Sequence, residues 1–235
     1  MLSSVSSSAA IGAAQPAFAL LPVGSCEQHG PHLPVGSDAL IATAIAEGVC
    51  RESDAWLLPT LPYGTSGEHR GFPGTVSLRP ETLALTVEDI AREICLAGIP
   101  RLVVLSGHGG NFILAPAIRY INVRLPRFTV LLVPERVMWP ELDETELHAG
   151  GDESSIILHL LPDSVGELPP GYIPDAPREA LNALPLKALS PSGIWGNPQT
   201  ATSDRGATLC SGIVRRVVDY INSAFLLIDR VKTVD

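Results

Sequence analysis

The sequence predicts an α/β fold of three layers (α/β/α), in which helices cover both faces of a mostly parallel central sheet. Four short apolar runs, bounded by Gly or Pro, have the length and composition of buried strands, and segments with helical periodicity separate them. Hydrophobic residues also make up 46% of the 235 residues, which suits a sizeable core. We expect residues 1–15 to form a partly ordered, Ser/Ala-rich lead-in and residues 16–235 to form a single domain.

The predicted strands are apolar runs that end at a turn or at a polar segment. They comprise residues 17–24, 56–64, 101–111 and 128–134. The second run leads into a Gly-rich loop, and the third continues directly into a glycine turn. Because helical segments lie between consecutive strands, parallel pairing with helical crossovers is the expected topology.

The predicted helices are segments with apolar residues at helical spacing. They comprise residues 38–50, 81–98, 112–125, 148–162 (a loop that leads into a helix) and 207–231. Ser37 or Asp38 is in place to cap the first helix, and Gly98 is in the expected position at the end of the second. Pro116 must lie in the first turn of the third helix. Residues 162–199 contain many prolines and glycines, which predicts mostly loop with short ordered pieces.

The composition argues against several classes of partner. The net charge is −9 and there is no polybasic patch, so we expect neither nucleic acid nor a membrane surface as a partner. The first 24 residues are apolar like a secretory leader, but no Lys or Arg precedes the apolar part, and Gln15 and Pro16 interrupt it. The cysteines are scattered without a CxxC pair, which indicates neither disulfides nor a thiolate zinc site. The expected compartment is the cytoplasm.

Polar side chains gather at one place in the predicted fold. In parallel α/β sheets, ligands bind outside the carboxyl ends of the strands. The polar residues that follow a predicted strand, or a strand and a loop, are Glu27, Ser66–His69, Ser106–Asn111, Glu135, His148 and Glu153. We therefore expect them to share one site at the carboxyl edge of the sheet.

The stretch GSCEQHGPHLPVGSD, residues 24–38, concentrates metal-ligating side chains. Its carboxylates and imidazoles are Glu27, His29, His32 and Asp38. His108 adds an imidazole and Glu153 a third carboxylate. Without His32, the candidate ligands number five, which is more than one tetrahedral zinc needs. Five such ligands fit two divalent ions that share a carboxylate. Such a pair, about 3.5–4 Å apart, can hold a bridging hydroxide and polarise a substrate carbonyl at the same time.

These residues also have structural explanations. Asp38 can cap the helix that begins at Ala39, and Glu153, in a helix first turn, can interact favourably with the helix dipole. We assign His32 to orienting the loop or supporting the ligands, in preference to direct ligation.

The spacing E-x-H-G-x-H-L-P-x-x-x-D is long and specific. Together with SGHGGN and HAGGDES, it closely resembles the creatininase (creatinine amidohydrolase) family, with matching motifs from Leu21 to about Leu160. The resemblance implies an α/β/α metal-dependent amidohydrolase with two divalent ions per subunit, and a homo-oligomer, with a hexamer favoured. The ligand types leave Zn, Mn and Fe(II) open.

The resemblance also implies a role for each candidate residue. The implied ligands of one ion are Glu27, Asp38 and His108, and those of the other are His29, Asp38 and Glu153, with Asp38 bridging. His148, in the HAG element, matches the family's proton-transfer histidine. A hydroxide that bridges the two ions would attack the scissile carbonyl, and His148 would give the proton to the leaving amine.

One departure from the family pattern argues against creatinine as the substrate. Creatinine-cleaving members carry a metal-binding carboxylate two residues after the histidine that matches His108, where this chain has Gly110. In members with HGGN, the glutamate that matches Glu153 supplies the missing ligand.

The loop YGTSGEHRGFPGTVSL, residues 63–78, bears on the substrate. FPGT occurs throughout the family, but SGEH resembles the creatininase-family peptidases of the mycofactocin system, which remove a modified C-terminal Val-Tyr-derived dipeptide from a precursor peptide. The resemblance implies this peptide as the partner. Ser66, Glu68 and His69 would contact it or orient ligands, or they only stabilise the loop. Trp139 can form an aromatic wall, although ordinary packing or an oligomer interface is the simpler explanation.

Other functions stay open beside this one. A related amidohydrolase would act on a small cyclic amide or a formamide, such as creatinine or a formamidopyrimidine. An inactive metal-binding scaffold would keep the ligands without hydrolysis, although every expected ligand position is filled. A serine hydrolase is not supported, because GTSGE does not match G-x-S-x-G.

Overall fold

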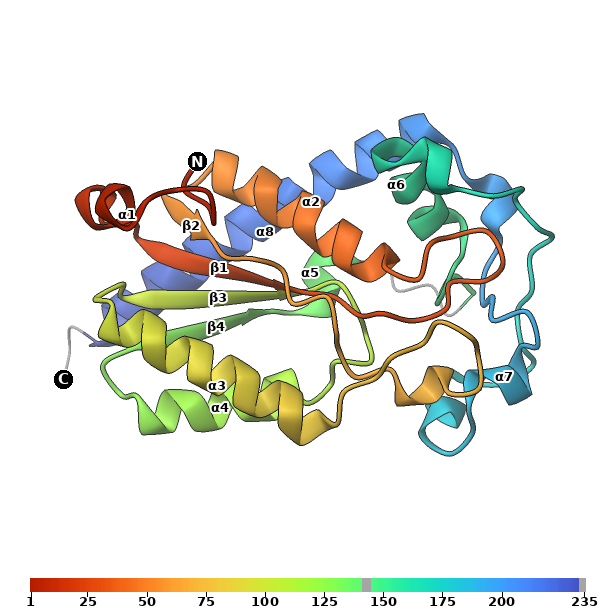
Figure 1. The fold of residues 1–235 in the computed structure, drawn as a ribbon, viewed down its shortest axis with the longest axis horizontal. Helices are drawn as coiled ribbons and strands as arrows, with labels where there is room; N and C mark the ends of the chain where they lie inside the picture. The colour runs from red at the N-terminus through yellow and green to blue at the C-terminus, as the bar shows by residue number, and fades with distance from the viewer. Residues whose placement is uncertain (141–144, 233–235) are drawn as a thin grey trace.

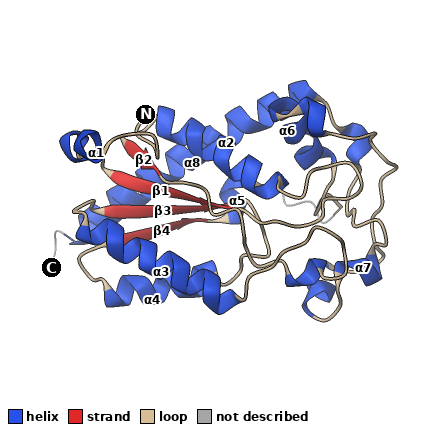
Figure 2. Ribbon diagram, viewed as in Figure 1, coloured by secondary structure: helices blue, strands red, loops and turns tan. Residues whose placement is uncertain are grey.

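The computed structural model describes residues 1–140 and 145–232, and over these residues four strands form one parallel sheet in the order β2-β1-β3-β4 (Figure 1, Figure 2). The strands are β1 (Phe18–Val23), β2 (Ala55–Leu57), β3 (Arg101–Ser106) and β4 (Thr129–Val133). Val23 pairs with Ser106 in the register of β1 and β3, so both strands end at the same level. The predicted α/β fold with a parallel central sheet is confirmed.

Helices cover both faces of the sheet (Figure 1). On one side lie α2 (Ser37–Arg51) and α8 (Ser203–Lys232), together with α6 (Gly151–Leu160), which packs against both beyond the ends of the strands. On the other side lie α3 (Pro80–Leu96) and α4 (Leu114–Arg124). Because successive strand side chains point to opposite faces, Leu20 packs in the first core and Leu21 in the second. The two cores fix the sheet between its helices and place its carboxyl edge.

The strand predicted over residues 56–64 is wrong beyond Leu57. Pro59 and Pro62 have no N–H to donate to a β-ladder. After the N–H of Leu58, which donates to the carbonyl of Leu20 (2.9 Å), the chain returns to β1 in an isolated bridge at Leu61, whose N–H donates to the carbonyl of Pro22 (3.0 Å). The last helix also begins earlier than predicted, at Ser203.

The side-chain cap predicted for α2 is wrong. The N-cap residue is Gly36, and no side chain caps the helix. The Ser37 hydroxyl donates to the carbonyl of Pro34 (2.7 Å), and the Asp38 carboxylate accepts from the Ser25 hydroxyl (2.6 Å). Asp38 therefore faces the end of β1 and not its own helix terminus. The other predicted helix features, Gly98 after α3 and Pro116 in the first turn of α4, are confirmed.

Short helices occupy several connecting segments. They are α1 (Ser8–Ala14), η1 (Gly67–His69), α5 (Glu135–Met138), η2 (Pro162–Ser164), η3 (Arg178–Asn182), α7 (Leu186–Leu189) and η4 (Pro198–Thr200). The expectation of loop with short ordered pieces over residues 162–199 is confirmed. α5 has no counterpart among the predicted elements, because its single turn is too short to show a period. Within the described part of the chain, no helix has the length and apolar character needed to cross a membrane.

Candidate metal centre

A cavity of about 680 Å³ opens at the carboxyl edge of the sheet. Polar side chains reach it from the turn after β3, the first turn of α2, and the loop and first turn of α6. Those that line it include Asp38, His108, His148 and Glu153. Of the residues expected to share this edge, His108, His148 and Glu153 line the cavity, as do Glu68, His69 and Glu135.

Glu27, Asp38 and His108 form the first ligand group. His108 Nε2 lies 3.1 Å from Glu27 Oε2, and His108 Nδ1 lies 3.2 Å from Asp38 Oδ2. One potential ligand atom from each residue lies within 4.8 Å of the others. Glu27 comes from the loop after β1, Asp38 from α2 and His108 from the turn after β3, so the parallel topology assembles the group.

His29, Asp38 and Glu153 form the second ligand group, with the same spread of ligand atoms. His29 Nε2 lies 3.1 Å from Asp38 Oδ1, and Glu153 Oε2 accepts the N–H of Ala149 (2.6 Å). Because Oδ1 of Asp38 faces His29 and Oδ2 faces His108, one carboxylate joins the two groups. The structure thus brings together all five predicted ligands, and metal binding by each of them stays a prediction.

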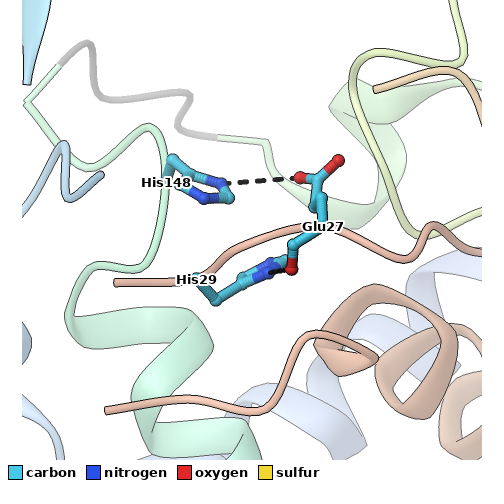
Figure 3. A group of neighbouring side chains, drawn as sticks. All are labelled: Glu27, His29 and His148. Carbon is cyan, nitrogen blue, oxygen red and sulfur yellow. Dashed lines mark hydrogen bonds and ion pairs between the residues drawn. The ribbon is translucent and has the colours of Figure 1, made fainter. Parts of the chain in front are cut away.

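His148 lies beside both groups (Figure 3). Its Nδ1 is 3.8 Å from Glu27 Oε1, and its ring centroid is 4.4 Å from that of His29. Glu27, His29 and His148 form a third set whose potential ligand atoms lie close together. His148 is therefore in position either to bind a metal or to exchange a proton with a molecule in the cavity.

The bonding of Glu27 tests whether these residues fit a metal ion. Both of its carboxylate oxygens are buried, and neither accepts a hydrogen bond from the described residues. A buried carboxylate without hydrogen bonds is costly, and a divalent cation would satisfy it. The mixed oxygen and nitrogen donors around Glu27 suit Zn, Mn or Fe(II). The residues present therefore fit a pair of divalent ions.

Burial and neighbouring charges shift the pKa values of the candidate ligands. Burial raises the pKa of Glu27 from 4.5 to about 8, against the attraction of His108. Burial alone would lower the pKa of His29, but nearby carboxylates, Asp38 first among them, raise it to about 10. Burial opposes the ionisation of Asp38, yet His29 and His108 hold its pKa well below 3.8. Without bound metal, both Glu27 and His29 would carry a proton at neutral pH.

We expect metal binding to release protons and to strengthen as the pH rises. Ligands must lose their protons to bind metal, and the raised pKa values of Glu27 (about 8) and His29 (about 10) keep both protonated at neutral pH. Zinc affinity should rise about tenfold per pH unit for each proton released, between about pH 6 and pH 8. Calorimetry in buffers with different ionisation heats counts these protons. A constant affinity over that range would contradict the raised pKa values.

The SGEH loop lies against the same ligands. His69 Nε2 is 3.3 Å from Glu27 Oε1, and Glu68 Oε1 is 3.5 Å from His108 Nε2. Glu68 and His69 also line the cavity, whereas Ser66 is fully buried and its hydroxyl has no hydrogen-bond partner among the described residues. Contact with a substrate is thus open to Glu68 and His69, and Ser66 can act only from within the protein.

His32 and Trp139 occupy different surroundings. His32 is 2% exposed, and its Nε2 lies 2.9 Å from the Ser154 hydroxyl. This contact ties the loop of residues 24–38 to α6, which agrees with the loop-orienting role expected for His32. Trp139 follows α5, is half-buried and lines the cavity, where it adds apolar surface.

Gly110 leaves room for the Glu68 carboxylate. A Cβ atom at position 110 would overlap both Glu68 Oε1 and His108 Nε2. In this chain, a third carboxylate near His108, beside those of Glu27 and Asp38, therefore comes from Glu68 of the SGEH loop and not from the turn after β3.

Two features of the site have no counterpart among the predicted site residues. Gln28 contacts several site residues, but an amide inside a ligand-rich stretch carries no metal-ligand signal of its own. Arg178 lines the cavity and pairs with Glu135 after β4, with its Nη2 3.2 Å from Glu135 Oε1. Arg178 comes from a segment without periodicity, so no local pattern indicates this distant pairing.

Comparison with known proteins identifies the family. The Creatininase family model, described as creatinine amidohydrolase, matches residues 4–221. The mycofactocin precursor peptide peptidase of Mycolicibacterium smegmatis is 39% identical over 214 residues, covering 86% of this chain and 83% of that protein. The creatinine amidohydrolase of Pseudomonas putida is 31% identical over 238 residues, covering 88% and 89%. A solved creatininase variant of the Zn-Zn type superposes with a TM-score of 0.80 at 29% identity, covering 92% and 93%. The chain therefore belongs to the creatininase family, as its motifs predict.

Proposed function

We propose that this chain removes the modified C-terminal Val-Tyr-derived dipeptide from the mycofactocin precursor peptide. As a member of its family it is a hydrolase of carbon–nitrogen bonds. The observation that supports this particular substrate is a pair of ligand groups that share Asp38 at a cavity, in a chain 39% identical to a mycofactocin precursor peptide peptidase.

The cofactors are two divalent metal ions per chain, which the shared ligand groups and the Zn-Zn creatininase support. Glu27, Asp38 and His108 would hold one ion, and His29, Asp38 and Glu153 would hold the other. When bound, such a pair would supply a hydroxide nucleophile from water at neutral pH and would polarise the scissile carbonyl, the latter worth several kcal/mol.

His148 is the residue to which we assign proton transfer. Its Nε2 donates to the carbonyl of Gln28 (2.8 Å), which leaves a lone pair on Nδ1. Burial and the charge of His29 hold the pKa of His148 well below 6.5, so the ring is neutral at pH 7. The neutral ring would accept at Nδ1 a proton of the attacking nucleophile, which derives from water, and would give it to the nitrogen as the C–N bond breaks.

The cavity suits a peptide end with an aromatic group. Its volume of about 680 Å³ is in the range of sites that enclose small organic ligands. Phe112 and Trp139 line it and offer flat apolar surface. These contacts support a tyrosine-derived group as part of the substrate.

Mass spectrometry can test this function with one panel of substrates. The zinc-loaded protein is incubated separately with the modified precursor peptide, with creatinine and with a formamidopyrimidine. We expect loss of the C-terminal dipeptide from the precursor and no change in the other two compounds. Conversion of creatinine to creatine instead would refute the proposal, and two bound ions without any hydrolysis would indicate a scaffold.

A small cyclic amide or a formamide is the second candidate substrate. The 31% identity to a creatinine amidohydrolase supports it. The glycine at position 110 argues against creatinine itself, because it leaves the turn after β3 without the carboxylate of creatinine-cleaving members, and the space beside it holds Glu68. The expected homo-oligomer, favoured as a hexamer, stays a prediction that mass photometry can test.

A further inference from the structure

Gln28 lies between the candidate ligands Glu27 and His29 in the sequence and is only 5% exposed. Its side-chain amide has a backbone partner at each end. Oε1 accepts the N–H of Gly30 (2.9 Å), and Nε2 donates to the carbonyl of Gly193 (3.1 Å). A backbone N–H only donates and a backbone carbonyl only accepts, so the amide has one orientation. Its oxygen and nitrogen therefore have fixed places in the site.

Gly193 makes this orientation possible. Its φ is +79°, in the region that favours glycine, and a Cβ atom there would overlap the amide of Gln28. A larger residue at position 193 would displace the amide. The turn before Ile194 is therefore shaped to hold the Gln28 side chain.

The second amide hydrogen of Gln28 sets the tautomer of His69. Gln28 Nε2 is 3.0 Å from His69 Nδ1. An amide nitrogen only donates, so Nδ1 of His69 accepts and the ring proton lies on Nε2. This Nε2 is 3.3 Å from Glu27 Oε1. The N–H of His69 thus lies beside one oxygen of the buried Glu27 carboxylate, whose other oxygen lies 3.1 Å from His108 Nε2.

The backbone carbonyl of Gln28 sets the tautomer of His148. His148 Nε2 is 2.8 Å from this oxygen, which only accepts, so Nε2 carries the proton. The lone pair is then on Nδ1, on the side of the ring that faces Glu27 (Figure 3). The Gln28 amide nitrogen is 3.1 Å from the same Nε2. Its two hydrogens already serve Gly193 and His69, so the carbonyl is the partner of Nε2.

We propose that Gln28 is a positioning residue: its side-chain amide fixes the ring proton of His69 on Nε2, and its backbone carbonyl fixes that of His148 on Nε2. It thereby presents the N–H of His69 and the lone pair of His148 to Glu27. This inference rests on the proton-transfer role proposed for His148. A fixed tautomer lets His148 accept a proton at Nδ1 without first moving one between its nitrogens.

The test compares Gln28→Glu and Gln28→Met in zinc-loaded protein with nitrogen-15-labelled histidine. A carboxylate at position 28 presents an acceptor where the amide presents a donor, so the proton of His69 should move from Nε2 to Nδ1. Methionine presents neither, so His69 should populate both tautomers. His148 should keep its proton on Nε2 in both variants, because its partner is the backbone. Long-range proton–nitrogen spectra distinguish these forms without any substrate, and the zinc content confirms that the centre is intact.

Turnover of the modified precursor peptide gives a second reading. Loss of a residue that orients a catalytic or ligating histidine typically lowers activity about 10- to 100-fold. We expect that loss in kcat for both variants, because the His69 N–H would no longer be held toward Glu27. KM should stay unchanged, because Gln28 does not line the main cavity. Gln199→Glu is the matched control. Gln199 is exposed and lies outside the cavity, so this substitution makes the same change of charge away from the site.

The proposal is overturned if His69 keeps its proton on Nε2 in both Gln28 variants, or if unmodified protein carries it on Nδ1. Unchanged kcat in a variant with altered tautomers would also overturn the positioning role. Failure of unmodified protein to cleave the peptide would contradict the proposed function. The tautomers of His69 and His148 could still be measured, because those spectra need no substrate. The two failures are therefore distinguishable.

Discussion

Replacing Asp38 by alanine should abolish binding of both metal ions and lower turnover about 10³-fold or more, because about 4 kcal/mol of lost stabilisation corresponds to three factors of ten. Oδ1 of Asp38 lies 3.1 Å from His29 Nε2, and Oδ2 lies 3.2 Å from His108 Nδ1. One side chain thus belongs to both ligand groups. Elemental analysis of dialysed protein gives the metal content per chain, and turnover is measured with the modified precursor peptide as substrate.

Two further variants separate loss of metal from general damage. Asp38→Asn keeps the shape of the side chain but not its charge, and it should lose the metals as well. Asp54→Ala removes an exposed carboxylate just before β2, at the opposite edge of the sheet, and should keep two ions per chain. Two ions retained by a folded Asp38→Ala variant would show that the ligand assignment is wrong.

Much of the fold could be predicted because local patterns agree with the tertiary structure. The apolar run of β1 is buried on both faces of a parallel sheet, and α3 ends just before Gly98, which has the positive φ that favours glycine. The errors occur where a distant partner overrides a local preference. Asp38 has the position of a helix cap, but the Ser25 hydroxyl and two histidines hold its carboxylate instead.

The candidate site, like the fold, could be predicted only in part. Glu27 and His108 could be placed together because both follow strands, and parallel strands bring their carboxyl ends to one edge. The surroundings of these residues could not be predicted. The contact of Gln28 with Gly193 depends on how an aperiodic segment folds back over the site, and Gly110 and Glu68 meet only in the folded protein. Such contacts leave no period or motif in the sequence.

Replacing His148 by alanine should lower kcat about 10²- to 10⁴-fold, the usual contribution of a general acid–base group, while both ions stay bound. His148 lies outside the two assigned ligand groups, and its Nδ1 is 3.8 Å from Glu27 Oε1. The loop should keep its place, because the backbone of His148 pairs with that of Trp195 through bonds of 2.9 and 2.8 Å that do not involve the imidazole. Turnover and metal content are measured on the same sample.

The metal content of this variant decides between the two roles that the geometry allows. His148 also forms a potential ligand set with Glu27 and His29. If His148 binds metal, its replacement should remove an ion along with activity. If His148 only transfers a proton, the variant should keep two ions and have a low kcat. His159→Ala is the matched control, because His159 is exposed on α6 and does not line the cavity, so it should change neither quantity. Full activity in the His148 variant would exclude this residue from the mechanism.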